Sequence, residues 1–415
     1  MLTDAPPTKR RATPDRPLRT AMVTGFRPTP AGGGSEKHVF ELARGLIGRG
    51  VEVDVICEDA SFLPDDVNPL ADRIIGVPSS RLKAKGWVER YREKSAALAE
   101  LIDPGRYDLV HCHSHYGFHA ALRLSARALR PRLVSTFHLT PLGSLRRFEQ
   151  LGIKLPEGAP IDRAVALMEE AAAILSDRCI AVSRGVAREI RDFYGVPASH
   201  IDVIHNWYDP AVFYPRPRAV ARRALGLDPS GTYVLYVGHF GEHRGWMMRD
   251  VLRLLPPHVR LLVVHADEEP DIAAEFGERV VFTGHASPGK MGVIFSAADL
   301  QAFTTVYGGF GLVLVEGMAC GCPPVAFDYS AMDETVTAES GYLVSDPTPE
   351  AFARGVLAAL AEGDAKREGA IHRAKSFDMN RQIDATLAVY RSLTMSRRLD
   401  PSVRPARPGS SRAAS

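Results

Sequence analysis

One short stretch combines backbone that a ligand can approach closely with a lone acid. It reads VYGGFGLVLVEGMACG and occupies residues 306–321. Gly308 and Gly311 leave backbone N–H groups uncovered, and the helix expected after them would point such groups at an anion. Glu316 follows within an apolar run, where a buried carboxylate needs a partner. That partner is either a backbone N–H in the core or the hydroxyl pair of a ligand such as a ribose.

A second glycine-rich loop lies near the start of the chain. Gly32, Gly33 and Gly34 stand in PTPAGGGSEKHV, between an expected strand and an expected helix. Such a loop can hold a phosphate or an oxyanion at the start of the helix. It does not match G-x-G-x-x-G, and no G-K-[ST] follows as in a P-loop. For this stretch alone, a glycine-rich surface turn is the alternative interpretation.

A third candidate, VGHFGEHRGW, is basic and follows the first expected strand of the second half. His239, His243 and Arg244 stand where that strand leads into a helix. A guanidinium can pair with a phosphate through two hydrogen bonds. A solvated basic loop explains the stretch equally well.

These candidates need elements to position them, and the chain offers short apolar runs that alternate with helical patterns. Runs of this kind predict parallel sheets covered on both faces by helices. The expected strands lie at 21–26, 51–57, 73–78, 109–114, 132–138, 179–183, 201–206, 233–240, 260–266, 279–286, 300–305, 323–328 and 341–345.

The fold class that follows is α/β, with two doubly wound, Rossmann-like domains facing a central cleft. We place the first domain at 19–207 and the second at 208–375, with a final helix at 376–395 and disordered tails at 1–18 and 396–415. Ligands of such domains bind outside the carboxyl ends of the strands, so the cleft is the expected site. Within the first domain we expect Ser35 to cap the first helix and Gly50 to end it.

Composition excludes several classes of protein. Lys and Arg number 51 against 49 Asp and Glu, a balance that argues against a nucleic-acid binder. The chain shows neither a membrane span nor a secretory signal, and a plain solvated tail is favoured over peripheral membrane contact. The five cysteines are few and lie mostly in apolar runs, which fits a reducing cytoplasm better than a disulfide scaffold.

No metal site is expected. Cys320 and Cys322 are too close together to form a zinc pair. His111 and His113 share one face of a strand, where a structural role is favoured over a metal pair.

The sequence resembles retaining glycosyltransferases of family 4, which have the two-domain GT-B fold. The motifs that carry the resemblance run from about residue 20 to 393 and include GGGSEKHVFELARGLIGRGVEVDVI, DLVHCHSHYG, VSTFHLT, CIAVSRGVAREI, IDVIHNWYDPAVFYP, VGHFGEHRG and YGGFGLVLVEGMACGCPPVAFD. Each motif alone is weak, but their shared order is specific.

The resemblance implies a nucleotide-sugar donor on the second domain and no other cofactor. It assigns the ribose to Glu316, the diphosphate to Arg244 and the neighbourhood of the transferred sugar to His138. The final helix would pack back on the first domain. The backbone expected around the phosphates and sugar is that of Gly33, Gly34, Gly311, Leu312 and Val313.

The chain departs from the family around the donor sugar. Gly308 stands where the family has a Glu that contacts the transferred sugar, and His239 stands where it has an arginine. Trp207 and Tyr208 replace a Gly-Val pair, which makes them, with His113, candidates for the acceptor side or the cleft.

We therefore expect a cytoplasmic, metal-independent enzyme that moves a sugar from a UDP, GDP or dTDP donor to a small polar acceptor. An aminocyclitol, an amino sugar or a thiol in antibiotic-type metabolism would fit these departures. Retention of configuration is inherited from the resemblance. The alternatives are a repurposed homologue that binds nucleotide sugar without forming a glycosidic bond and, less favoured because G-x-G-x-x-G is absent, an NAD(P)-dependent oxidoreductase.

Overall fold

Every strand expected from the sequence is present in the computed structural model, and all of them pair in parallel. The structure describes residues 16–398 apart from 31, 60–67, 128–129, 153–162, 239, 241–244, 246, 266–268 and 330. The strands are β1 (Arg19–Val23), β2 (Glu52–Asp59), β3 (Ile74–Pro78), β4 (Leu109–His113), β5 (Arg132–Phe137), β6 (Arg178–Ala181), β7 (Ile201–Val203), β8 (Thr232–Val237), β9 (Val259–Val264), β10 (Val280–Phe282), β11 (Leu300–Phe303), β12 (Pro324–Phe327) and β13 (Tyr342–Val344).

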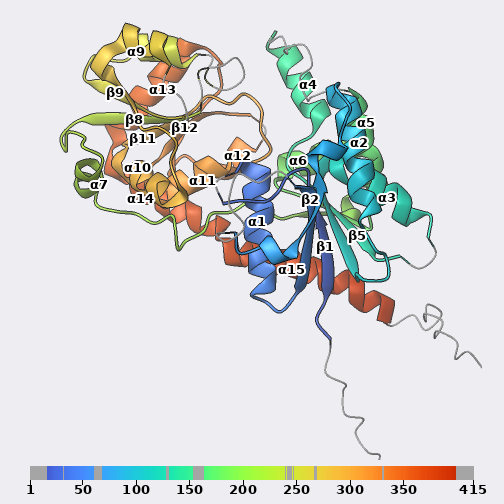
Figure 1. Cartoon of the computed structure of the whole chain (residues 1–415). Helices are drawn as coiled ribbons and strands as arrows, with labels where there is room; N and C mark the ends of the chain where they lie inside the picture. The colour runs from blue at the N-terminus through green and yellow to red at the C-terminus, as the bar shows by residue number, and fades with distance from the viewer. Residues whose placement is uncertain are drawn as a thin grey trace, which may run out of the picture.

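The helices between the strands cover both faces of each sheet (Figure 1). They are α1 (Gly34–Ile47), α2 (Trp87–Glu100), α3 (Phe118–Ser125), α4 (Pro141–Gln150), α5 (Arg163–Leu175), α6 (Arg184–Tyr194), α7 (Arg218–Ala224), α8 (Met248–Leu254), α9 (Pro270–Phe276), α10 (Pro288–Ala297), α11 (Leu312–Ala319), α12 (Met332–Thr335), α13 (Pro349–Glu362), α14 (Asp364–Ala374) and α15 (Met379–Arg398).

The first lobe is built on a sheet of order β3-β2-β1-β4-β5-β6-β7. Successive residues of a strand point to opposite faces, and β1 shows the result. Met22 packs with α1 and α15 on one face, while Ala21 and Val23 pack with α2 and α3 on the other. Because both faces are buried, the strand reads as a continuous apolar run.

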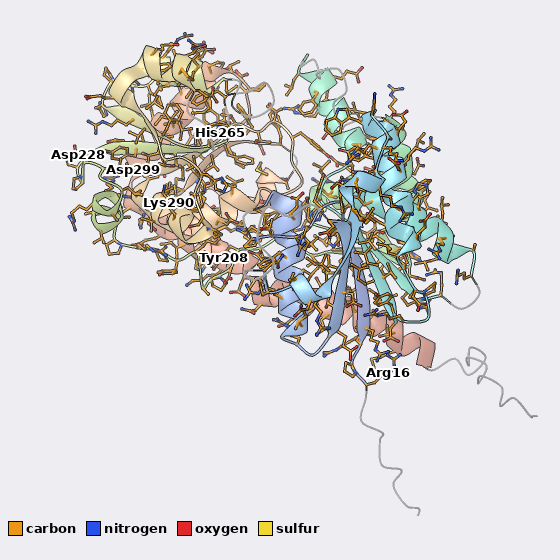
Figure 2. All side chains as sticks on the ribbon, in the orientation of Figure 1. Arg16, Tyr208, Asp228, His265, Lys290 and Asp299 are labelled. Carbon is orange, nitrogen blue, oxygen red and sulfur yellow. The ribbon has the colours of Figure 1, made fainter. Side chains whose placement is uncertain are left out.

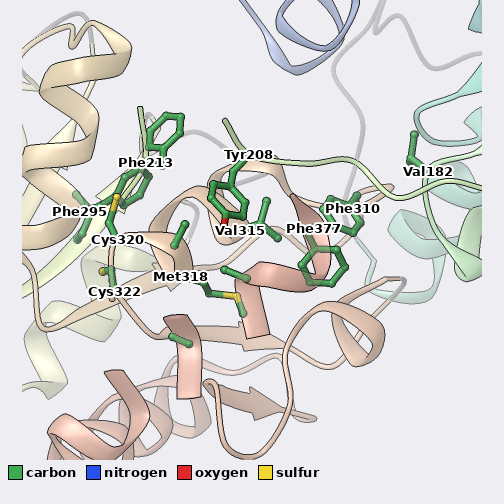
Figure 3. Close-up of a cluster of buried hydrophobic side chains, with 14 of the residues drawn as sticks. Val182, Tyr208, Phe213, Phe295, Phe310, Val315, Met318, Cys320, Cys322 and Phe377 are labelled. Atoms are coloured by element: carbon green, nitrogen blue, oxygen red, sulfur yellow. The ribbon is translucent and has the colours of Figure 1, made fainter. Parts of the chain in front are cut away.

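The second lobe repeats this plan on a sheet of order β10-β9-β8-β11-β12-β13. Val234 of β8 packs with α8 and α13, and Leu235 packs with α10, α11 and α14. The core behind Leu235 continues into the first lobe, because it includes Val182 as well as Phe310 and Phe377 (Figure 3). The rings of Phe310 and Phe377 meet edge to face, 5.1 Å apart.

The chain passes between the lobes twice, and the two crossings are hydrogen-bonded to each other. The Tyr208 N–H donates to Phe377 O, and the Met379 N–H donates to Tyr208 O, both at 3.1 Å. Figure 2 shows Tyr208 at the junction. After the second crossing, α15 lies along the first lobe, where Tyr390 Oη is 2.5 Å from His111 Nδ1.

Helix α1 begins two residues earlier than the expected cap allowed. Gly33, and not Ser35, is the N-cap, and the helix ends at Ile47 with Gly48 as its C-cap, before Gly50. Gly33 adopts extended backbone and no side chain caps the helix. The prediction failed because Ser35 lies within the first turn, where its hydroxyl bonds the Glu36 carboxylate instead.

Three further observations concern the cysteines, membrane-spanning helices and the ends of the chain. All five cysteines are buried and free, as expected. None of the helices in the described part is long and apolar enough to cross a membrane. Most of the two expected tails lies outside the described residues, but Arg16, at the border of the first, pairs with Asp108.

Candidate active site

In each sheet the order reverses between two neighbouring strands, β1 and β4 in the first lobe and β8 and β11 in the second. The loops that leave these strands diverge and form a crevice at their carboxyl ends. The two glycine-rich loops predicted to bind a ligand both leave from such a point. One follows β1 and leads into α1, and the other follows β11 and leads into α11.

The starts of these two helices meet across the lobes. A side-chain carbon built on Gly34 would lie 3.4 Å from Leu312 Cδ1. Gly33 caps α1, and Gly311, at φ +85°, caps α11; neither helix start has a side-chain cap. The left-handed backbone at Gly311 strongly favours glycine. The uncapped starts of two helices, with their dipole ends, therefore lie close together, an arrangement that can bind an anion.

Glu316 faces the other lobe from the second turn of α11. Its carboxylate accepts a short hydrogen bond from the Lys37 ammonium of α1. The side chains are only 12% and 7% exposed, so this is an ion pair largely removed from water. Burial raises the pKa of Glu316, and the Lys37 charge acts against that rise. Burial alone would lower the pKa of Lys37, but Glu316 and Glu41 outweigh it and raise the pKa.

A second carboxylate stands one turn along α1. Glu41 Oε1 is 3.9 Å from Lys37 Nζ, and Glu41 Oε2 accepts a hydrogen bond from Trp207 Nε1 at 2.8 Å. Burial raises the pKa of Glu41 to about 7. The ammonium of Lys37 therefore has one carboxylate from each lobe within reach.

Three imidazoles gather near Trp207. His113 Nδ1 is 3.1 Å from His138 Nε2, and these two rings are stacked. The His38 ring lies 4.7 Å from that of His138 and 4.3 Å from that of Trp207. His38 Nδ1 is 2.8 Å from Asn206 Oδ1, so that nitrogen donates and Nε2 is left as an acceptor.

All of these rings are neutral near neutral pH. Burial lowers the pKa of His138 to about 4 and that of His111 to about 3. Burial, and then the neighbouring imidazoles, hold the pKa values of His38 and His113 well below their usual range. The cluster thus offers uncharged hydrogen-bonding groups, which suit sugar hydroxyls better than phosphate.

The same three imidazoles have the composition of a metal site. The ligand atoms of His38, His113 and His138 lie within 4.8 Å of one another. Neutral imidazoles are common metal ligands. In this conformation, however, His113 Nδ1 and His138 Nε2 are directed at each other.

Gly308 and Gly309 differ sharply in their surroundings. In the described part of the chain, a side-chain carbon on Gly308 would meet nothing closer than Thr305 Cγ2 at 3.8 Å, and the φ of Gly308 lies outside the left-handed region. One on Gly309 would lie 1.6 Å from the carbonyl oxygen of His138. Packing therefore demands glycine at 309 but not at 308.

Two polar contacts hold this loop and its neighbourhood against the first lobe. Tyr307 Oη donates to Glu189 Oε2 at 2.7 Å and accepts from the Thr140 N–H at 3.2 Å. On the other side, Glu334 of α12 accepts the backbone N–H groups of Arg184 and Gly185, at the start of α6. Burial opposes ionisation of Glu334, but these bonds and one from His205 lower its pKa.

The structure brings together most of the residues selected from the sequence. Gly33, Gly34, Gly311, Leu312, Val313 and Glu316 lie at or near the facing helix starts, with His113, His138 and Gly308 close by. Trp207 is buried beneath His38, and Tyr208 is buried at the lobe crossing. His239 and Arg244 lie outside the described residues.

Sequence reasoning did not select Lys37, His38 or Glu41. The three stand in KHVFE, and the structure buries both His38 and Glu41. One signal was available: Lys37 and Glu41 stand at positions i and i+4 of a helix whose neighbouring positions are apolar and enter the core. Sequence spacing alone could not show that Lys37 reaches the other lobe.

Comparisons with known proteins show what the chain is similar to. Residues 32–212 match the family model described as Glycosyltransferase Family 4, and residues 231–362 match the one described as Glycosyl transferases group 1. The D-inositol 3-phosphate glycosyltransferase of Acidothermus cellulolyticus is 28% identical over 425 residues, covering 93% of this chain and 92% of the relative.

Solved structures share the two-lobed arrangement. Sucrose-phosphate synthase from Thermosynechococcus elongatus superposes with a TM-score of 0.77 at 22% identity and covers 91% of this chain and 100% of its own. Anabaena HepE, solved in complex with UDP and glucose, gives a TM-score of 0.67 at 20% identity, covering 90% and 100%.

Proposed function

The chain belongs to glycosyltransferase family 4 and has its two-domain GT-B fold, and from this premise we propose that it moves an uncommon sugar from a nucleoside-diphosphate donor to a small polar acceptor. The observation that carries the proposal is the meeting of two uncapped helix starts beside Glu316. The helix starts suit a diphosphate, and the carboxylate suits a ribose.

We assign the departing charge to these helix starts together with Arg244 and His239. A nucleoside diphosphate leaves as a concentrated anion, and preorganised N–H donors stabilise such charge in the transition state. This assignment needs no divalent cation. His138 and His113, both neutral, would hydrogen-bond the hydroxyls of the transferred sugar. In a retaining reaction the acceptor attacks from the leaving-group side, and the departing phosphate oxygen takes its proton.

The uncommon donor is inferred from Gly308. Among the described residues, the first side-chain carbon of a larger residue at this position would make only an ordinary contact, 3.8 Å from Thr305 Cγ2. Packing therefore does not explain the glycine, whereas a bulkier or differently substituted sugar would. We propose an octose, deoxy or amino sugar as donor, and an aminocyclitol, amino sugar or thiol as acceptor, in antibiotic-type metabolism.

The test is a screen of UDP-, GDP- and dTDP-sugars against these acceptors, read by mass spectrometry, with NMR of the product anomer. A product with the donor's anomeric configuration supports the proposal, and inversion contradicts its stereochemical part. Nucleotide-sugar binding without any product across the panel would favour the repurposed homologue. Nucleotide binding itself is checked by thermal shift, because a ligand of the native state raises the melting temperature.

A further inference from the structure

We propose that Lys37 is a positioning residue of the donor site, whose ammonium keeps the Glu316 carboxylate charged and fixed for the ribose hydroxyls. The proposal rests on the function proposed above, which gives Glu316 the ribose. Lys37 belongs to the first lobe and Glu316 to the second. The donor site would therefore be complete only when the two lobes are together.

The side chain of Lys37 is held by contacts from three elements. Its ammonium bonds Glu316 on α11, lies 3.9 Å from Glu41 on its own helix and lies 4.6 Å from the centre of the Phe213 ring. Asp209, in the segment after β7, adds a further negative charge nearby. A lysine with so little freedom gives its partner a fixed orientation.

The charge on Lys37 matters because Glu316 is buried. A ribose diol offers two O–H donors, and an ionised carboxylate can accept both, while a protonated one accepts less and donates. Burial favours the protonated form and raises the pKa of Glu316, and Lys37 opposes this. Without the ammonium, the carboxyl would take up a proton at a higher pH and lose the diol as a ligand.

Glu41 lets Lys37 stay in place when the ribose arrives. If the ribose hydroxyls share the oxygens of Glu316, the ammonium still has a carboxylate within 3.9 Å. Trp207 fixes that carboxylate by its 2.8 Å hydrogen bond. Burial raises the pKa of Glu41 to about 7, and the Lys37 ammonium favours its charged form, so this carboxylate can keep the ammonium paired when the donor binds.

The experiment measures nucleotide affinity by calorimetry from pH 5.5 to 8.5, using UDP and GDP and their 2′-deoxy counterparts. In the wild type, the preferred ribonucleotide should bind about tenfold more tightly than its deoxy form, the scale of one hydrogen bond to a charged group. Lys37→Met should lose most of that ratio at pH 7 and regain it as the pH rises. Lys37→Arg keeps a positive charge, so the pH at which the ribose preference is half lost should stay at the wild-type value.

Controls separate this proposal from its premise. Lys375→Met changes an exposed lysine and should alter nothing. Glu316→Gln should remove the ribose preference at every pH; if it does not, the role given to Glu316 fails. If Glu316→Gln acts as expected but Lys37→Met loses its ribose preference at the same pH as the wild type, the inference about Lys37 is overturned. Should Lys37→Met not fold, Lys37→Gln must show the same shift.

Discussion

The carbonyl oxygen of His138, in the first lobe, occupies the space that a side chain on Gly309 of the second lobe would need. This close approach places the loop before α11 directly against the residue assigned to the transferred sugar. It also separates the roles of two adjacent glycines, because a side-chain carbon on Gly308 would make only an ordinary contact, 3.8 Å from Thr305 Cγ2.

Replacing Gly309 by Ala should therefore disturb the fold, while Gly308→Ala should leave the melting temperature unchanged. The alanine at 309 would meet the His138 carbonyl at 1.6 Å, which is impossible without moving the loop. Overpacking of this kind costs about 1–3 kcal/mol. We expect a lower melting temperature and at least a tenfold loss of turnover, and equal behaviour of the two variants would contradict the packing described.

Gly308→Glu restores the carboxylate usual in the family and tests the inferred donor. The first carbon of the new side chain makes no close contact with the described residues, so we expect the variant to fold with a melting temperature near that of the wild type. If the glycine makes space for the true donor, kcat/KM with that donor should fall at least tenfold, mainly because KM rises. Improved transfer from UDP-glucose without loss of the native reaction would show instead that a dispensable contact has been lost.

Glu169 should make the protein less stable as the pH rises. The residue is 1% exposed, and Tyr194 donates to it at 3.2 Å. Burial raises its pKa to about 8, from an ordinary value of 4.5. Between these values the native state holds a proton that the unfolded chain has lost, so the free energy of unfolding falls from about pH 5 to pH 8.

Glu169→Gln should remove that loss. Urea unfolding should show the variant more stable than the wild type by on the order of 2–4 kcal/mol at pH 8.5, with little difference at pH 5. Glu170→Gln, at a partly exposed neighbouring position, is the matched control and should leave the pH dependence unchanged. Parallel pH curves for wild type and Glu169→Gln would contradict the assignment.

Removal of metal ions should leave transfer intact. The leaving-group charge is assigned to helix starts and basic side chains, and His113 and His138 already bond each other at 3.1 Å. Turnover after EDTA treatment and gel filtration should stay within about twofold of the untreated enzyme, a difference of less than 0.5 kcal/mol in the barrier. A loss that one added divalent ion restores would assign the three-imidazole cluster a metal instead.

The sheets could be predicted from the sequence because each strand carries its own pattern. Buried parallel strands such as β1 and β8 are continuous apolar runs, and the glycine-rich loops after β1 and β11 indicate where the next helices begin. Contacts between the lobes carry no such local pattern. Lys37 and Glu316 are 279 positions apart, and their pairing depends on how two separately built lobes sit together.

The second contact between the lobes and the cap of the first helix could not be predicted from the sequence either. The sequence does not show that Glu334 closes the start of α6 in the other lobe. Ser35 was a reasonable cap by residue type, but the helix starts two residues earlier and has Gly33 as its cap.

The paired crossings at Tyr208 and Phe377 join the lobes at one place. Two segments hydrogen-bonded side by side restrict the relative movement of the lobes more than a single tether would. A protease that cuts one crossing would leave the halves joined by the other segment. Separating the lobes therefore requires two cuts.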